Sequence, residues 1–297
     1  MIAFMKASDY ETYMHVALEE AKKSLRGGNN GFGAAIIKNG VIIALTHDTE
    51  ETDTDPTAHA EMKAIGKAAR ITGKNLHGCT LISTHEPCPM CSFALVWSGI
   101  STLVYGYSID DAIKQGRNRI AFGCEDAFAR SGKPIEIVKG ILWDECSLLY
   151  RKDVRDEIKK LRNASDSQLE ACNRASAEKR AAWFRETSTN VSSGYKDPKE
   201  AAYHLLLKRF GITEKEAPVV EHSSDRIVFH SQNFCPTLEA CKILDIDTRF
   251  VCRHYNEKST DSLIKLIDSG LRFERNYEKL RPYFPYCEEM ILSADAP

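Results

Sequence analysis

The sequence lacks any apolar run approaching the roughly 20 residues that a membrane-spanning helix needs, so no membrane partner is expected. It also lacks an excess of either charge, because 40 Lys and Arg residues face 42 Asp and Glu residues and leave a formal net charge of -2. General attraction to phosphate backbones is therefore not expected, and nucleic acid is a disfavoured partner. The ten cysteines lack the dense, regular spacing of a secreted disulfide scaffold, which predicts a reducing, cytoplasmic location.

The composition is that of an ordinary globular protein. Apolar residues make up 43% and charged residues 28% of the chain, which supplies material for a sizeable core. At 297 residues the chain exceeds the usual size of one domain, and it contains no internal repeat. We expect a first domain over residues 1–160, a helical connector and linker over residues 161–194, and a smaller α+β accessory domain over residues 195–297.

Strand and helix patterns alternate along the first domain. Apolar residues recur at helical spacing near the start, and Asn39-Gly40 favours a tight hairpin turn between two β-rich runs. The order of the elements predicts a layered α/β sheet with parallel pairing and right-handed crossovers. We expect helices over residues 7–25, 58–71, 89–97 and from 144 onward, and strands over residues 33–38, 41–46, 80–84, 102–107 and 135–138.

Two short motifs carry the residues best suited to chemistry: PTAHAE at residues 56–61 and HEPCPMC at residues 85–91. One imidazole, that of His59, and two thiolates, those of Cys88 and Cys91, are preferred Zn²⁺ ligands. Three protein ligands leave the fourth tetrahedral position open for water, which is typical of a catalytic site. The cysteines flank a predicted helix start, where unpaired backbone N–H groups favour thiolates.

Glu61 stands two residues after the histidine of this ligand set. Side chains two positions apart diverge around a helix, so His59 and Glu61 share a centre only if it lies beyond the helix's N-terminal end. Zinc supplies hydroxide near neutral pH, and a neighbouring carboxylate can move the protons that removal of an amino group requires. The pattern H-x-E with P-C-x-x-C is the signature of zinc-dependent deaminases.

On these motifs, residues 8 to about 160 resemble the cytidine deaminase-like superfamily, most of all its guanine/guanosine deaminase and tRNA adenosine deaminase branch. The segment at residues 138–146 resembles the entry to that branch's last helix. The resemblance implies a three-layer α/β/α fold, one Zn²⁺ per chain and a homodimer or larger homo-oligomer. It assigns zinc to His59, Cys88 and Cys91, proton transfer to Glu61, and contacts with the base to the backbone around Ala60 and Glu86.

Two positions depart from the branch's pattern. Asp48 stands eleven residues before the zinc histidine, where the family usually has an asparagine that hydrogen-bonds the base or ribose. Arg119 stands fourteen residues after Tyr105, where guanine deaminases have an acidic residue. A pocket with both residues would prefer a different donor and acceptor pattern, or a ring with an acidic substituent. The alternatives are a turn residue at Asp48 and a solvated surface charge at Arg119.

The sequence therefore predicts a zinc-dependent hydrolytic deaminase that releases ammonia from a purine-like, guanine/guanosine-like base or nucleoside. One alternative is a tRNA adenosine deaminase, which would need a basic groove. An alternative of another class is a non-catalytic, zinc-stabilised binding or regulatory protein. His85 stays open between a fourth zinc ligand in a closed structural site, a group facing the substrate, and a simple loop residue.

The accessory domain carries weaker signals. It resembles aminothiazoline-carboxylate hydrolase-like domains, mainly around residues 233–236 and 275–277, and this resemblance assigns no catalytic residue. A second metal centre and core packing are the two interpretations of its later cysteines, and core packing is favoured because free cysteine is commonly buried. These residues are Cys235, Cys241, Cys252 and Cys287, with His230 and His254 nearby in the sequence.

Overall fold

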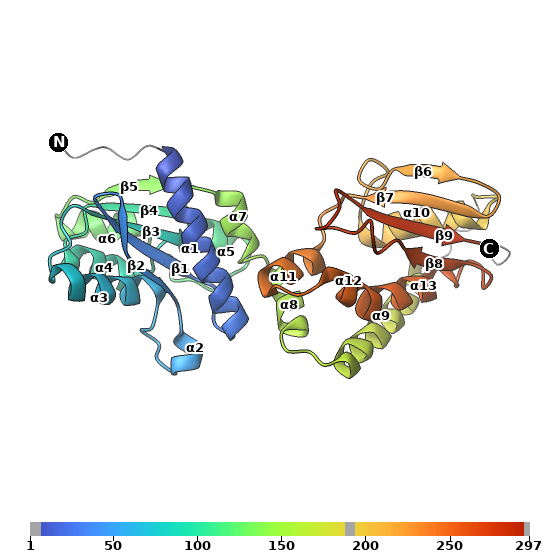
Figure 1. The fold of residues 1–297 in the computed structure, drawn as a ribbon, viewed down its shortest axis with the longest axis horizontal. Coiled ribbons are helices and arrows are strands. Elements are labelled where there is room, and N and C mark those ends of the chain that lie inside the picture. Colours follow the sequence, from blue (N-terminus) through green and yellow to red (C-terminus); the bar gives the residue numbers. More distant parts are fainter. Residues whose placement is uncertain (1–6, 188–193, 294–297) are drawn as a thin grey trace. The chain divides into compact units, whose positions relative to one another are not determined.

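The computed structural model describes residues 7–187 and 194–293. By its internal contacts the chain divides into two compact units, residues 1–156 and 157–297, and each contains its own β-sheet (Figure 1). The small polar residues that the sequence analysis assigned to a linker lie mostly at positions 188–193, outside the described residues.

Every helix and strand predicted for the first unit is present, with ends shifted by at most a few residues. The helices are α1 (Ala7–Gly27), α2 (Glu50–Asp53), α3 (Ala60–Thr72), α4 (Pro89–Ser98), α5 (Ile109–Lys114), α6 (Cys124–Ser131) and α7 (Trp143–Leu148). The strands are β1 (Gly33–Lys38), β2 (Val41–His47), β3 (Cys79–His85), β4 (Thr102–Tyr107) and β5 (Glu136–Lys139). The helix α8 (Lys152–Leu161) follows and crosses the boundary between the units.

The first sheet has the order β2-β1-β3-β4-β5 and is mixed, because it combines the predicted hairpin with the predicted parallel pairing and adds an antiparallel pair, β1–β3, that was not predicted. The pairs β3–β4 and β4–β5 are parallel, whereas β1 is antiparallel to both β2 and β3. The reason lies in the hairpin. The crossover through α3 makes β3 run in the same direction as β2. Because β3 pairs with β1, and β1 runs opposite to β2, the β1–β3 pair is antiparallel.

Helices cover both faces of this sheet, so the three-layer α/β/α architecture is confirmed (Figure 1). On one face α3, α4 and α6 bury a core that includes Ala64, Leu95 and Phe128 against the strands. On the other face α1 packs on β1, β2 and β3. Its buried residues, among them Met14 and Leu18, repeat at helical spacing.

The topology determines which edge of the sheet carries the candidate site. The strand β3 is buried along its whole length and ends at His85. The Glu86 backbone N–H donates to the Tyr107 carbonyl at 2.7 Å and so joins the ends of β3 and β4. Because β3 and β4 are parallel, their carboxyl ends meet at one edge of the sheet, which is where ligands bind in open α/β sheets.

The second unit is the predicted smaller α+β fold. Its antiparallel sheet has the order β6-β7-β9-β8, and its core forms between α10, α13 and the strands. The strands are β6 (Val219–His222), β7 (Arg226–Ser231), β8 (Arg272–Arg275) and β9 (Cys287–Leu292). The helices are α9 (Asp166–Thr187), α10 (Pro198–Phe210), α11 (Pro236–Leu244), α12 (Thr248–Val251) and α13 (Lys258–Ile264), with a π-helical turn, η2 (Cys252–Glu257), between the last two.

The segment expected to be a connector is instead part of this second unit. The helix α9 buries Leu169, Asn173 and Arg180 and packs on η2 and α13. The sequence pattern was misleading because α9 is rich in charge and its buried face is narrow.

Two further findings concern the chain as a whole. All ten cysteines are free thiols. No helix within the described part of the chain is long and apolar enough to cross a membrane.

Close packing of α1 on β1 gives a test of the fold. A Cβ atom added at Gly33 would lie 2.0 Å from the Ala17 carbonyl oxygen and 2.7 Å from the Ala21 nitrogen, both backbone atoms of α1. We expect Gly33→Ala to lower the free energy of unfolding by about 1–3 kcal/mol or more, because the backbones of α1 and β1 would have to move apart to make room for the methyl group. Chemical denaturation followed by circular dichroism measures it.

The matched control is Gly66→Ala in α3, where an added Cβ meets nothing within 4 Å. This change should leave stability equal or raise it, by up to about 1 kcal/mol, because alanine favours a helix interior. Equal effects of the two substitutions would contradict the packing of α1 on β1.

Candidate active site

The three predicted zinc ligands come from the starts of two helices. His59 is the N-cap residue of α3 and Cys88 is the N-cap residue of α4, and both have an extended backbone. Neither side chain caps its own helix, so both are free to turn toward a common centre. Cys91 follows in the first turn of α4. The two halves of the site therefore converge as the motif spacing predicted.

The distances between these side chains fit a tetrahedral zinc ion. His59 Nδ1 lies 3.6 Å from Cys88 Sγ and 3.5 Å from Cys91 Sγ. Zinc bonds of usual length at tetrahedral angles would separate a nitrogen and a sulfur ligand by about 3.6 Å. Within residues 7–187 and 194–293, no other group of histidine, cysteine and acidic side chains is arranged to hold a metal.

His85 does not complete a closed four-ligand sphere. Its Nδ1 lies 2.8 Å from the Glu86 carbonyl oxygen, and it is not part of the ligand group. Burial lowers the pKa of His85 to about 3, with Arg119 and Arg117 contributing, so the ring is neutral. The protein therefore offers three donors and leaves one tetrahedral corner for another ligand.

The surroundings of Cys88 and Glu61 change the charge states of these two groups. The pKa of Cys88 is lowered to about 4 by hydrogen bonding from the Cys91 thiol, aided by His59, which favours a thiolate. Glu61 is only 5% exposed, and its Oε2 lies 3.6 Å from Cys91 Sγ. Burial raises the pKa of Glu61 to about 7, with the Cys88 charge adding to the shift, so this carboxyl group can both take and give a proton near neutral pH.

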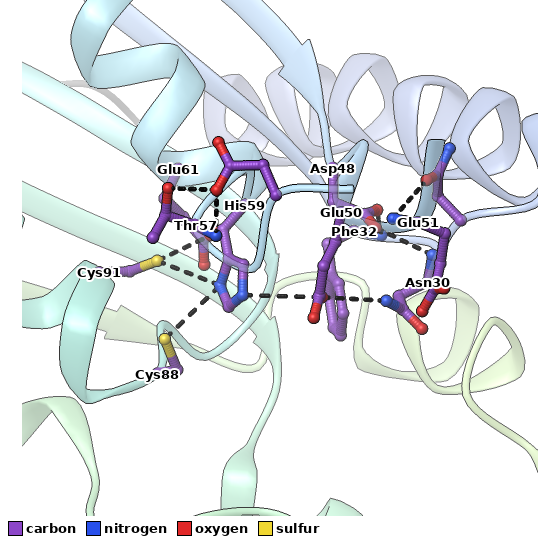
Figure 2. A network of polar contacts seen from close by, with 12 residues as sticks. Asn30, Phe32, Asp48, Glu50, Glu51, Thr57, His59, Glu61, Cys88 and Cys91 are labelled. Atoms are coloured by element: carbon purple, nitrogen blue, oxygen red, sulfur yellow. Dashed lines mark hydrogen bonds and ion pairs between the residues drawn. The ribbon is translucent and has the colours of Figure 1, made fainter. Parts of the chain in front are cut away.

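A second acidic residue, Glu50, stands on the opposite side of the histidine ring (Figure 2). Its Oε2 lies 3.8 Å from His59 Nε2 and accepts a hydrogen bond from Asn30 Nδ2 at 3.1 Å. An acidic partner at the non-ligating nitrogen orients a zinc-binding histidine. Sequence reasoning missed Glu50, because it lies in an acidic run with no spacing that ties it to the motif.

The ligand group opens into a cavity of about 510 Å³. Its lining includes the metal-binding donors His59 and Cys88 and the carboxyl group of Glu61, together with Phe32 and Arg119 from other segments. A cavity of this size accommodates a small organic molecule. The arrangement can bring a ring substituent to a metal-bound centre beside a proton carrier.

Asp48 does not face this cavity, which corrects its predicted contact with the substrate. The side chain is fully buried, and Oδ1 accepts hydrogen bonds from Ser24 Oγ at 2.5 Å and the Phe32 N–H at 2.8 Å. Oδ2 accepts from the Asn30 N–H at 2.9 Å. The carboxylate therefore holds the loop before β1, from which Asn30 and Phe32 reach the cavity. This is closer to the alternative of a turn-stabilising residue.

The remaining predicted contacts differ in position. Glu86 lines the cavity, and its carboxylate is held by the N–H groups of Ile109 and Cys124, both at 2.9 Å. Ala60 is fully buried and is not part of the cavity lining, and its carbonyl accepts a hydrogen bond from Thr46 Oγ1 at 2.8 Å. Arg119 lines the cavity and is not a fully solvated surface charge.

The later cysteines form no second metal centre among the described residues. Cys241 and Cys252 are buried, whereas Cys235 and Cys287 are half-buried. Packing therefore accounts for the first two, as predicted. The resemblance of this unit to aminothiazoline-carboxylate hydrolase-like domains stays a prediction.

Comparison with known proteins agrees with the geometry. Residues 7–107 match the model of the cytidine and deoxycytidylate deaminase zinc-binding region. A tRNA-specific adenosine deaminase of Bacillus subtilis is 36% identical over 160 residues, which cover 54% of this chain and 96% of that protein. A guanine deaminase of the same organism is 39% identical over 110 residues, which cover 36% of this chain and 70% of that protein.

A third relative, a tRNA-specific adenosine deaminase of Aquifex aeolicus, is 48% identical over 96 residues. That match covers 32% of this chain and 64% of the relative, slightly less than two thirds of its length. The matches and the His59, Cys88 and Cys91 cluster lead to one conclusion: the chain belongs to the zinc-binding cytidine and deoxycytidylate deaminase family, as a hydrolase of carbon–nitrogen bonds with one zinc site.

Proposed function

We propose that the protein removes an exocyclic amino group from a purine-like base or nucleoside, of guanine or guanosine type, and releases ammonia. The observation that carries this proposal is the buried Glu61 carboxyl group beside three zinc-type donors in an accessible cavity. A purely structural metal site gives no reason for a buried carboxyl group at that position.

The residues then have distinct roles. His59, Cys88 and Cys91 hold the metal, which when bound supplies hydroxide near neutral pH. Glu61 accepts a proton from the attacking water and delivers protons to the ring nitrogen and to the leaving amine. Glu50 keeps the imidazole in the orientation that presents Nδ1 to the two sulfurs.

Contacts with the ring are expected from the cavity walls. We propose that the backbone around Ala60 and Glu86 and the side chain of Arg119 contribute to base recognition. Asp48 contributes indirectly, because it fixes the loop that carries Phe32. An aromatic side chain in the wall offers a stacking surface to a flat heterocycle.

A tRNA adenosine deaminase is the second candidate, and two of the relatives described above favour it by their names. Against it stand the formal net charge of -2 and the presence of Glu50 and Glu51 in the cavity lining, which disfavour a polyanion. Ammonia release from a panel of bases, nucleosides and tRNA separates the two. A non-catalytic role has no support from the family match.

Location and assembly complete the proposal. Ten free cysteines support a reducing, cytoplasmic location. A homodimer or larger homo-oligomer is proposed from the resemblance, and the second unit is proposed to tune specificity or assembly. Sedimentation equilibrium of the full chain tests the oligomeric state.

Replacement of the proton carrier tests the chemistry. We expect Glu61→Gln to lower kcat for ammonia release about 10²–10⁴-fold, because glutamine keeps the shape of the side chain but cannot carry the proton. Zinc content, measured by plasma emission spectrometry, should stay at the wild-type level because Glu61 is not a ligand.

Glu19→Gln is the matched control, since Glu19 lies on the exposed surface of α1 and pairs with Lys22. Its kcat should equal that of the wild type. A wild-type kcat in zinc-loaded Glu61→Gln protein would show that Glu61 is not the proton carrier.

Substitution of Asp48 tests its structural assignment. In Asp48→Asn the amide nitrogen cannot accept a hydrogen bond from the loop N–H groups that the carboxylate now holds. We expect a loss of about 1–3 kcal/mol in the free energy of unfolding, while the ratio of rates among substrates stays constant. Asp126→Asn on the exposed surface of α6 should change neither quantity. Unchanged stability with an altered substrate order would instead show direct contact with the substrate.

A further inference from the structure

One arginine, Arg119, lines the cavity, and two more, Arg117 and Arg155, lie near it. The Arg119 guanidinium lies over the Phe32 ring, 5.3 Å from its centroid. Arg155 Nη1 donates to the Asn30 carbonyl at 2.7 Å, and both Asn30 and Phe32 line the cavity. Arg117 is the third member of the cluster. Its pKa is lowered to about 10 by burial and by the positive charges of Arg155 and Arg119, which are therefore near it.

The arginine cluster, Arg117, Arg119 and Arg155, has acidic groups near one member: Asp48 and Asp156 act on Arg155, whereas burial and the other two arginines dominate at Arg117. The only hydrogen bonds of Arg119 and Arg155 go to backbone carbonyls, and none of the three forms an ion pair within the described chain. By contrast, Arg151 pairs with Asp153 at 2.7 Å. Arg155 and Arg119 repel the partly buried charge of Arg117, and no ion pair within the described chain offsets this repulsion, so an anion that joins the cluster is favoured.

A buried polar atom without a partner lies at the same end. His85 is only 3% exposed and lines the cavity, and its Nε2 has no hydrogen-bond partner. Because Nδ1 faces the Glu86 carbonyl, the proton resides on Nδ1 and Nε2 is an acceptor. The ring packs against Phe32 and Tyr150, at centroid distances of 5.5 and 5.0 Å. This end of the cavity is thus equipped for a ligand that brings both a donor and an anion.

The cluster lies away from the metal-binding donors. Phe32 and Asn30 lie on the side of the imidazole opposite the two cysteines (Figure 2). A substrate whose amino group reaches Glu61 would therefore direct its remote substituent toward the arginines. The cavity of about 510 Å³ has room for a ring with such a substituent.

We propose that the substrate carries an anionic substituent, best matched by the phosphate monoester of a nucleoside, and that Arg117, Arg119 and Arg155 bind this group. The inference rests on the proposed deaminase function and names its substrate class. Guanidinium groups match phosphate and carboxylate oxygens with paired hydrogen bonds, and three of them suit a dianion better than a single carboxylate. Glu50 and Glu51 in the same lining disfavour a long nucleic-acid strand.

The test compares matched substrates on the zinc-loaded full chain. Ammonia release is measured with purine bases, their nucleosides and the corresponding nucleoside 5′-monophosphates. We expect kcat/KM for the monophosphate to exceed that for its nucleoside by about 100-fold, mainly through KM, because charge-assisted hydrogen bonds are strong. A purine ring that carries a carboxylate is tested in the same way. If its kcat/KM exceeds that of the monophosphate, the anion site is supported, with a carboxylate as its ligand.

Variants assign the effect to the cluster. The double variant Arg117→Gln, Arg119→Gln should lose about 100-fold more in kcat/KM for the monophosphate than for the neutral nucleoside, whose own loss reports the contact of Arg119 with the base. Arg155 is left unchanged because it also holds the Asn30 loop. Arg130→Gln is the control, since Arg130 belongs to α6, lies over the Phe122 ring and is not part of the cavity lining. It should leave both rates as they are.

The outcomes separate the two proposals. Equal kcat/KM for nucleoside and monophosphate, with equal losses in the double variant, would overturn the anion site while the deaminase function stands. Turnover of tRNA alone would overturn the small-molecule substrate. If no substrate releases ammonia, the proposed function fails, and calorimetric titration with monophosphate and nucleoside then decides the anion site: tighter binding of the monophosphate supports it and equal binding overturns it.

Discussion

The structure depends on two helices that begin at one point. His59 precedes α3 and Cys88 precedes α4, and the backbone at both positions is extended, so each side chain points beyond its own helix. The unpaired N–H groups and positive dipole ends of both helices face the same centre, which favours the thiolates that in turn hold the metal. The order of β1, β3 and β4 fixes where these two helix starts meet.

Around that centre the cavity is electrically divided. The metal end carries thiol and carboxyl groups, among them Glu61 and, behind the imidazole, Glu50. The other end carries Arg119 over Phe32, with two more arginines nearby. Such a division can orient a polar ligand before the reaction begins. The metal-binding end accepts the part of the ligand that reacts, and the arginine end attracts an anionic group. Orientation of this kind is a recognised source of rate enhancement.

The ligand group could be predicted from the sequence because each half is local: His59 and Glu61 lie on one helix start, and the cysteines flank another. The helices and strands of the first unit followed from periodicity and turn residues for the same reason. The antiparallel direction of β1 and β3, the burial of Asp48, and the partnership of Glu50 with the imidazole arise from contacts between distant segments, and no local pattern encodes them.

The measurement that tests the central claim most directly is the zinc K-edge X-ray absorption spectrum of the purified full chain. The account predicts one zinc per chain, bound by two sulfurs at about 2.3 Å, one imidazole nitrogen at about 2.0 Å and one oxygen from solvent. A third sulfur, a second imidazole or the absence of zinc would contradict a catalytic centre built from His59, Cys88 and Cys91 with one open corner.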